Sequence, residues 1–211
     1  MTFASRQDAG HKLGQFLRQR GIKADLVLGL PRGGVVVAAE AAHVLNLPLD
    51  VVVVRKIGHP FQREFAIGAL AEPDLVFLSS QTASFRDQQA LDDVITEETK
   101  RLREYSRRFH RSGMPVVEGK TVLLVDDGLA TGATAEAAVH SVRARGARWI
   151  IVAAPVAALD AAGRLRQAAD AVEVLVADEA FEAVGQYYRG FAQATDEEVI
   201  SLLRNPLAKA A

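Results

Sequence analysis

The chain has no cysteine among its 211 residues, so a disulfide framework is excluded and nothing points to secretion. It also has almost no excess charge. The formal net charge of −1 gives no reason to expect nucleic acid or an anionic membrane as the main partner. No apolar run reaches membrane-spanning length, and the first residues lack the apolar core of a signal peptide. We therefore expect a soluble cytoplasmic protein.

Several common motifs are absent as well. No Gly-x-Gly-x-x-Gly follows any predicted strand, and no lysine follows a Gly-rich turn as a phosphate-loop hydrolase requires. We expect no dedicated metal site made of protein ligands, because no histidine has metal-ligand spacing; the histidines are His11, His43, His59, His110 and His140. There is no internal repeat or low-complexity linker, so residues 1–211 are expected to form one domain.

The most informative stretch is residues 121–134, TVLLVDDGLATGAT. An uncharged aliphatic run over 122–125 predicts a strand buried on both faces of a parallel sheet. Asp126 and Asp127 follow, then a turn of small residues, and then an Ala-rich helix. Backbone N–H groups of such a turn, in front of the positive end of a helix, suit a phosphate. We expect Gly132 to let a ligand approach the backbone closely.

The two carboxylates suit a different chemical group. They would repel a phosphate, but they can accept hydrogen bonds from neutral hydroxyls beside it. A phosphate next to a pair of hydroxyls describes a ribose 5-phosphate. An ordinary strand–turn–helix corner of chance composition is the structural alternative.

A second stretch, residues 25–45, repeats the arrangement of strand, Gly-containing turn and helix. Its turn is Pro31-Arg32-Gly33-Gly34, which adds a guanidinium that can pair with anion oxygens. In a parallel sheet both turns would open at the same rim. Two anion cradles at one rim fit a sugar with phosphate at one end and pyrophosphate at the other.

With these residues in place, the chain resembles the type I phosphoribosyltransferases over nearly its whole length. The resemblance implies that Asp126 and Asp127 hold the ribose hydroxyls of phosphoribosyl pyrophosphate. It assigns the 5-phosphate to the turn formed by Gly128, Leu129, Ala130, Thr131, Gly132, Ala133 and Thr134. It assigns the pyrophosphate to Arg32, Gly33, Gly34 and the catalytic Lys56, with a peptide at Pro31-Arg32 that is often cis. Arg55 is expected to bind the substrate as well. Mg²⁺ is expected as cofactor, coordinated mostly by substrate oxygens and water.

Residues 49–55 predict a third buried strand that ends at two cations, Arg55 and Lys56, which places both at the same rim of the sheet. The following segment, residues 57–66, is a poor helix and a poor strand. It reads either as a surface loop or, by the resemblance, as a mobile catalytic loop that closes over the sugar. Residues 68–72 and 75–78 are expected to form the short hairpin or strand that follows this loop in the family.

The remaining pattern alternates strands and helices. Helices are predicted at 5–20, 87–111, 134–145 and 159–169, and further strands at 149–153 and 171–176. This alternation indicates an α/β fold with a doubly wound parallel sheet. The expected helix 87–111 is acidic first and basic later, as the helix dipole favours, so its charges are taken as a solvated face.

The last part of the chain changes character. Phe181, Tyr187, Tyr188 and Phe191 fall within eleven positions, which predicts either a seal on the sheet edge or a small hood over roughly 178–195. Under the second interpretation, Tyr188 and Phe191 contact a planar base. Ala130 stands where 6-oxopurine enzymes of the family carry an acid. This departure argues against hypoxanthine or guanine and fits adenine-type members.

Three functions therefore compete. The first is a phosphoribosyltransferase, for which the resemblance implies a homo-oligomer, with a dimer expected. The second is a non-catalytic regulatory protein that binds phosphoribosyl pyrophosphate, although no helix-turn-helix segment is visible. The third is an unrelated doubly wound enzyme, such as a nucleotide hydrolase.

Overall fold

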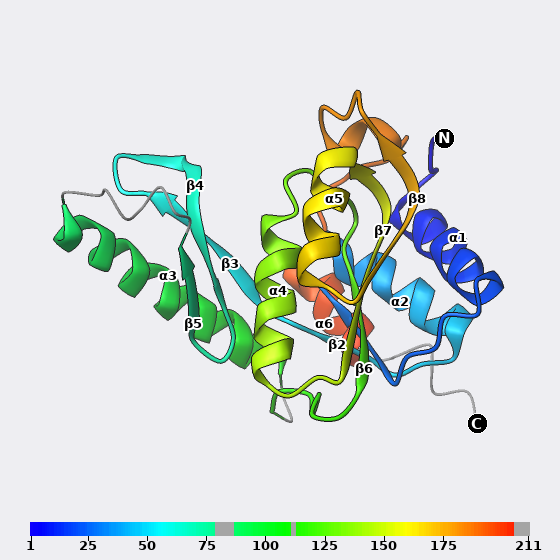
Figure 1. Cartoon of the computed structure of the whole chain (residues 1–211), viewed down its shortest axis with the longest axis horizontal. Helices are drawn as coiled ribbons and strands as arrows, with labels where there is room; N and C mark the ends of the chain where they lie inside the picture. Colours follow the sequence, from blue (N-terminus) through cyan, green and yellow to red (C-terminus); the bar gives the residue numbers. More distant parts are fainter. Residues whose placement is uncertain (79–86, 111–112, 205–211) are drawn as a thin grey trace.

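The computed structural model describes residues 1–78, 87–110 and 113–204, without the side chains of residues 63, 64 and 66. Arg111, the end of the expected helix 87–111, lies outside this description. The main sheet is parallel with strand order β2-β1-β6-β7-β8 (Figure 1). Its strands are β1 (Leu26–Gly29), β2 (Leu49–Val51), β6 (Thr121–Val125), β7 (Trp149–Ala158) and β8 (Ala171–Asp178).

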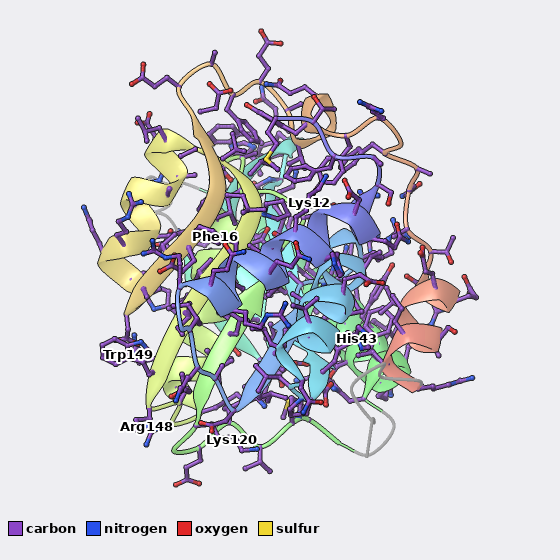
Figure 2. The ribbon with its side chains drawn as sticks, turned by 90° about the vertical axis from the view of Figure 1, so that its right-hand side faces the viewer. Lys12, Phe16, His43, Lys120, Arg148 and Trp149 are labelled. Atoms are coloured by element: carbon purple, nitrogen blue, oxygen red, sulfur yellow. The ribbon has the colours of Figure 1, made fainter. Side chains whose placement is uncertain are left out.

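Helices cover both faces of this sheet, because alternate residues of each strand point to opposite sides. On one face Val27, Leu123 and Val125 pack against α1 (Arg6–Gln19) and α2 (Gly33–Leu45). On the other face Leu28 and Leu124 pack against α4 (Ala133–Ala144) and α5 (Leu159–Ala168). Figure 2 shows α1 beside α2 in front of the sheet, with Lys12 and Phe16 labelled along α1. The doubly wound α/β fold predicted from the sequence is confirmed.

The sheet order places a crevice beside the two informative stretches. β1 leads to α2 on one face and its neighbour β6 leads to α4 on the other, so the strand order reverses between them. Ligands of open α/β sheets bind at such a reversal, outside the carboxyl ends of the strands. The turns that follow Gly29 and Val125 both lie at this point.

The segment 49–66 differs from the prediction. It is not one strand followed by a loop: β2 ends at Val51, and β3 (Val54–His59) joins a separate antiparallel sheet of order β3-β4-β5. The expected loop is part of a hairpin of β3 and β4 (Gln62–Ala71). The short hairpin expected after it is confirmed, because residues 68–71 of β4 pair with β5 (Leu75–Leu78). Local residue composition missed these strands, because cross-strand pairing stabilises them.

This small sheet and α3 (Gln88–Phe109) form an arm that projects from the main sheet (Figure 1). The helix packs its apolar stripe, including Leu91, Val94 and Leu102, against Ile57 and Leu70 of the hairpin. At the carboxyl end of the chain, α6 (Asp196–Arg204) closes the same core through Val199. Thr195 Oγ1 accepts a hydrogen bond from the Glu198 N–H at 3.1 Å and so caps the first turn of this helix.

One strand is longer than predicted. The sequence predicts that β7 ends before Pro155, but the strand continues to Ala158. Its register with β8 pairs Ala154 with Val174 and Val156 with Val176. The pairing therefore resumes beyond the proline, although proline itself has no N–H to donate.

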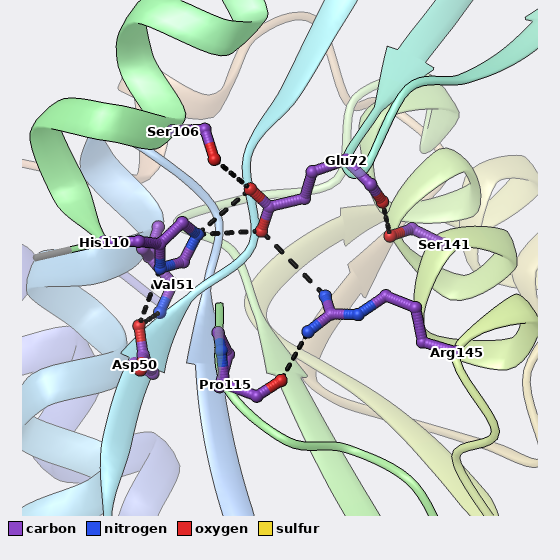
Figure 3. A network of polar contacts seen from close by, with 8 residues as sticks. All are labelled: Asp50, Val51, Glu72, Ser106, His110, Pro115, Ser141 and Arg145. Carbon is purple, nitrogen blue, oxygen red and sulfur yellow. Dashed lines mark hydrogen bonds and ion pairs between the residues drawn. The ribbon is translucent and has the colours of Figure 1, made fainter. Parts of the chain in front are cut away.

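A buried polar network fixes the arm to the main sheet (Figure 3). The carboxylate of Glu72, directly after β4, accepts hydrogen bonds from Ser106 Oγ at 3.0 Å and from His110 Nε2 at 2.9 Å. His110 Nδ1 lies 3.4 Å from Asp50 Oδ1 of β2. Ser141 of α4 donates to the Glu72 carbonyl oxygen, and Arg145 Nη1 lies 4.0 Å from Glu72 Oε1.

Charge balance explains why this network can be buried. It joins two carboxylates, Glu72 and Asp50, to two cations, Arg145 and protonated His110. Burial alone would lower the pKa of His110, but hydrogen bonds and the charges of Asp50 and Glu72 raise it to about 9. The imidazole therefore remains charged at neutral pH, and its ion pairs hold the ends of β4 and α3 against β2.

This network predicts a loss of stability in alkaline solution. The folded-state pKa of His110 is about 9, above the ordinary value of 6.5. Its contribution is therefore fully present below about pH 6.5 and is lost as the pH rises through about 9. Urea unfolding from pH 6 to pH 10 should show a decrease on the order of 2–3 kcal/mol. His110→Gln should abolish this dependence at a cost of about 3–5 kcal/mol.

His11→Gln provides the matched control, because His11 is exposed on α1 and bonds only Gln15 among the described residues. That variant should keep the alkaline decrease. A His110→Gln variant with an unchanged pH profile would contradict the assignment to His110.

Candidate active site

The acidic pair lies at the carboxyl end of β6, half-buried. Each carboxylate has one oxygen engaged within the protein. Asp126 Oδ1 accepts the N–H of Asp127 at 2.8 Å, and Asp127 Oδ2 accepts Nε–H of Arg6 at 2.7 Å. Within the described part of the chain, Asp126 Oδ2 and Asp127 Oδ1 accept no hydrogen bond. Two neighbouring acceptor oxygens are thus available at one rim of the sheet.

Electrostatics make this pair costly in the absence of a ligand. Burial raises the pKa of Asp126 well above its usual value of 3.8, and the charge of Asp127 raises it further. Burial also raises the pKa of Asp127, and the hydrogen bond from Arg6 only partly opposes this. A raised carboxyl pKa means that stability is lost as the pH rises through it. The two charged carboxylates therefore lower the stability of the folded state at neutral pH. Charged groups that destabilise the fold in this way are typical of functional sites.

The turn after the acidic pair is anchored at Leu129. Its N–H donates to the Val156 carbonyl at 2.9 Å, and its own carbonyl accepts the Ala158 N–H at 2.9 Å. The Leu129 side chain is also buried. Leu129 therefore holds the turn against β7 and offers no group to a ligand, contrary to its predicted place among the phosphate donors.

The other predicted phosphate-binding residues surround the start of α4. Ala130, Thr131, Ala133 and Thr134 are exposed, and Gly128 and Gly132 are half-buried. Gly132 is the N-cap with φ of 74°, the left-handed region that favours glycine. A Cβ there would lie 3.3 Å from Leu165, on the α5 side. The backbone conformation is therefore sufficient by itself to require glycine at this position.

The second turn lies directly against the acidic pair. A Cβ on Gly33 would lie 2.0 Å from Asp127 Oδ2 and 2.6 Å from Arg6 Nε. A Cβ on Gly34 would lie 2.9 Å from Asp126 Oδ1. The two turns thus form one continuous rim, and glycine is needed where they meet. The Pro31-Arg32 peptide is cis, as the resemblance implied.

The cations predicted to bind the substrate are held elsewhere in this structure. Arg55 donates to Glu98 Oε2 of α3 at 2.9 Å, and with Lys56 it lines a cavity of about 540 Å³ beside that helix. Arg32 Nη1 lies 3.9 Å from Asp196 Oδ1. The prediction that Arg55 and Lys56 point to the rim of the main sheet is therefore wrong for this conformation, because β3 belongs to the arm.

The carboxyl-terminal hood is joined to the beginning of the chain. The Phe3 N–H donates to the Tyr187 carbonyl at 2.7 Å, and the Arg189 N–H donates to the Phe3 carbonyl at 2.8 Å. Tyr188 is buried, and its hydroxyl donates to the Asp127 carbonyl at 2.6 Å. Burial, with the charge of Asp127, raises its pKa. Tyr188 thus supports the acidic pair and does not present a ring face to a base, contrary to the prediction.

Phe191 is more accessible, with 39% of its surface exposed. One face of its ring is covered by the guanidinium of Arg6, whose central carbon lies 3.9 Å from the ring centre. Sequence reasoning missed Arg6 altogether. A signal was present, because a cation in the first turn of a helix opposes the helix dipole and needs another reason to be there.

The arrangement suits a neutral diol beside an anion. Two free carboxylate oxygens can accept two neighbouring hydroxyls, and the N-terminus of α4 can bind a phosphate. In the described part of the chain, no group of three or more carboxylate, histidine or cysteine side chains could hold a metal ion.

Among the described residues, no helix is long and apolar enough to cross a membrane.

The contact at Gly33 yields a testable consequence. Gly33→Ala should separate Arg6 from Asp127, because no space exists for a methyl group between them. The loss of a charge-assisted hydrogen bond should cost about 1.5–3 kcal/mol in urea unfolding. The Arg6 Nε–H signal in an NMR spectrum should lose its hydrogen-bonded shift.

Gly163→Ala in α5 is the matched control, because a Cβ there meets nothing within 4 Å. It should stabilise the protein by about 0.5–1 kcal/mol and leave the Arg6 signal unchanged. An unaltered Arg6 signal in Gly33→Ala would contradict the tight contact described above.

Comparisons with known proteins address the family. A family model described as "Phosphoribosyl transferase domain" matches residues 3–189. The chain is 44% identical over 204 residues to a Mycobacterium tuberculosis H37Rv protein named "Putative phosphoribosyl transferase Rv0571c". That match covers 95% of this chain and 46% of the relative, so the chain spans about half the length of the curated relatives it matches.

Solved structures agree on the fold. The crystal structure of TT1426 from Thermus thermophilus matches with a TM-score of 0.83 and 43% identity, and covers 96% of this chain and 98% of that one. The AQ2163 protein from Aquifex aeolicus, at 14% identity, shares the fold with a TM-score of 0.50 over 82% of this chain and 74% of its own. On the strength of the family match and the acidic pair at the sheet rim, the chain belongs to the phosphoribosyl transferase domain family.

Proposed function

We propose that this protein is a phosphoribosyltransferase, which displaces pyrophosphate from phosphoribosyl pyrophosphate with a nitrogenous base. One observation carries the proposal. Asp126 and Asp127 each keep one free carboxylate oxygen at the point where the two turns meet. Two such oxygens match the two ring hydroxyls of a ribose, and the N-terminus of α4 matches its 5-phosphate.

The proposed reaction requires no covalent bond between the protein and the substrate. The bond from the anomeric carbon to pyrophosphate breaks as the base nitrogen attacks, and the transition state resembles a sugar cation. No protein nucleophile is required, so the residues act by positioning, charge stabilisation and water exclusion. Asp126 and Asp127 would orient the ribose and favour positive charge on its ring. The Gly33-Gly34 turn would receive the pyrophosphate oxygens.

Mg²⁺ fits this proposal as a cofactor carried by the substrate. The free oxygens of the acidic pair can receive metal-bound water or sugar hydroxyls, while the described residues hold no complete protein site. When bound, the ion would neutralise charge on the pyrophosphate leaving group.

Catalysis would require the arm to change position or its ion pairs to exchange. Arg55 is paired with Glu98, and Lys56 lines the cavity beside α3. We infer that the β3–β4 hairpin carries Lys56 to the pyrophosphate when substrate binds. A regulatory protein that binds phosphoribosyl pyrophosphate without turning it over is the second candidate, and the held position of Arg55 is the observation that favours it.

The acceptor base is proposed to be of the adenine type, because Ala130 provides no acid at the exposed edge of the turn. A homodimer in the cytoplasm is also proposed, on the family resemblance. Pyrophosphate release with a panel of purines, pyrimidines and nicotinate-like bases tests the first proposal, and turnover of any base excludes the purely regulatory candidate.

The central test measures ligand affinity and stability together. Isothermal titration calorimetry with phosphoribosyl pyrophosphate and Mg²⁺ should show binding below millimolar concentration. Asp126→Asn should weaken it about ten- to a hundredfold, because one charge-assisted hydrogen bond of roughly 1.5–3 kcal/mol is lost. The same variant without ligand should melt no lower than the parent at pH 7–8, because the pKa of Asp126 is raised by burial and by Asp127.

The matched control is Asp160→Asn, an exposed carboxylate in the first turn of α5. It should change neither binding nor melting by more than a small amount. If Asp126→Asn melts far below the parent while its folded fraction binds normally, the carboxylate is structural and the proposal fails.

The hairpin makes a separate prediction. Amides of residues 57–66 should exchange with solvent much faster than those of β6 in the ligand-free protein, and should slow when substrate and Mg²⁺ are added. Hydrogen-exchange mass spectrometry provides the measurement. Exchange as slow as that of Val122–Val125 would exclude a closing role for this hairpin.

A further inference from the structure

Arg6 makes three contacts that link separate parts of the site. Its Nε–H donates to Asp127 Oδ2 at 2.7 Å, and its Nη1–H donates to the Ala192 carbonyl at 2.6 Å. Its guanidinium also stacks on Phe191 at 3.9 Å from the ring centre. One side chain from the first turn of α1 therefore touches both the acidic pair and the hood.

The energetics show that this placement is specific. Only 11% of the Arg6 side chain is exposed, so its charge is largely removed from water. It also lies at the positive end of α1, where a cation is unfavourable. Both costs must be offset by its partners. Asp127 is the carboxylate that does so, and the same ion pair opposes the rise in the pKa of Asp127 caused by burial.

The geometry also determines which oxygen Asp127 can present. Arg6 engages Oδ2 and lies against the space above Gly33, where a Cβ would be only 2.6 Å from Arg6 Nε. Oδ1 is left free in the described structure. Without Arg6, the Asp127 side chain could rotate or take up a proton, and neither form would hold a sugar hydroxyl in a fixed position.

We propose that Arg6 is a positioning residue that fixes Asp127 for the ribose and seats residues 188–192 of the hood over the acidic pair. The part that concerns the ribose rests on the proposed function; the part that concerns the hood does not. In this proposal Arg6 acts through Asp127: its Nε and Nη1 donate to protein oxygens and one guanidinium face is covered by Phe191.

The hood is tested without any ligand. Hydrogen-exchange mass spectrometry of Arg6→Gln should show exchange of residues 187–192 at least about tenfold faster than in the parent, because the bond to the Ala192 carbonyl and the stacking on Phe191 are lost. Exchange in β6 should remain unchanged. Equal hood exchange in the two proteins would overturn the proposal.

A matched control exists on the same helix. Arg20 also pairs with a carboxylate, Glu173 at 2.8 Å, and also lies over an aromatic ring, Phe16 at 5.5 Å, but at the opposite end of α1. Arg20→Gln should leave both hood exchange and substrate binding at parental values. If Arg20→Gln accelerates hood exchange as much as Arg6→Gln does, the effect belongs to the stability of α1 and the proposal fails.

The ribose is tested by a double-mutant cycle with phosphoribosyl pyrophosphate and Mg²⁺. Arg6→Gln should weaken binding about ten- to a hundredfold in the parent but less than about threefold in the Asp127→Asn background. Arg6→Lys, which retains the charge, should recover part of the loss. Fully additive losses would show that Arg6 contacts the substrate directly or acts only through stability, and would overturn the proposal.

Different results would contradict the proposed function and the proposed role of Arg6. If the parent binds no phosphoribosyl pyrophosphate, the proposed function fails and the ribose role of Arg6 fails with it, while hood exchange still decides the seating role. If the parent binds but the cycle is additive, the proposed function stands and the role of Arg6 is wrong.

Discussion

Two adjacent carboxylates at the end of one buried strand repel each other, and the surrounding structure is arranged around that repulsion. Asp126 and Asp127 cannot turn away, because the strand before them is buried and the turn after them is held to β7 at Leu129. The repulsion is partly offset by one backbone N–H and one guanidinium that each bond a carboxylate oxygen. Two glycines of the neighbouring turn leave room for these oxygens. What remains unsatisfied is one oxygen on each carboxylate, which is the property that a sugar-binding site needs.

The network around Glu72 shows how the same chain treats charges that serve structure. There, two carboxylates meet two cations, and Glu72 accepts bonds from Ser106 and His110. The pKa of His110 is raised to about 9, so the pairing is complete at neutral pH. At the acidic pair, Arg6 is the one cation among the described residues that bonds a carboxylate, and both carboxyl pKa values are raised. The buried charges around Glu72 are balanced, which is typical of a structural network. The charges of the acidic pair are not balanced, which is typical of a functional site.

The sequence predicted what depends on local pattern. The buried runs before Asp126 and Pro31 are strands, the turns after them meet at one rim, and the order of elements led to the doubly wound sheet. It failed where long-range pairing decides. Residues 57–66 have no regular strand pattern in the sequence, yet they form a hairpin because β3 and β4 pair with each other. Arg6 and Asp127 are 121 positions apart, and no local signal connects them. The roles of Tyr188 and Leu129 could not be predicted either, because the hydroxyl of Tyr188 and the backbone groups of Leu129 bond residues that are distant in the sequence.

The link between the beginning of the chain and the hood has a consequence for biosynthesis. Residues 3–6 bond to residues 187–192, so the acidic pair has its complete set of neighbours only after nearly the whole domain has been translated. On the ribosome, the sheet with its two turns can form earlier, because β7 and β8 precede the hood. Until the hood emerges, Arg6 has Asp127 but neither Phe191 nor Ala192 to hold it. The contacts of Arg6 with Phe191 and Ala192 therefore form after the sheet, because they join residues that lie far apart along the domain.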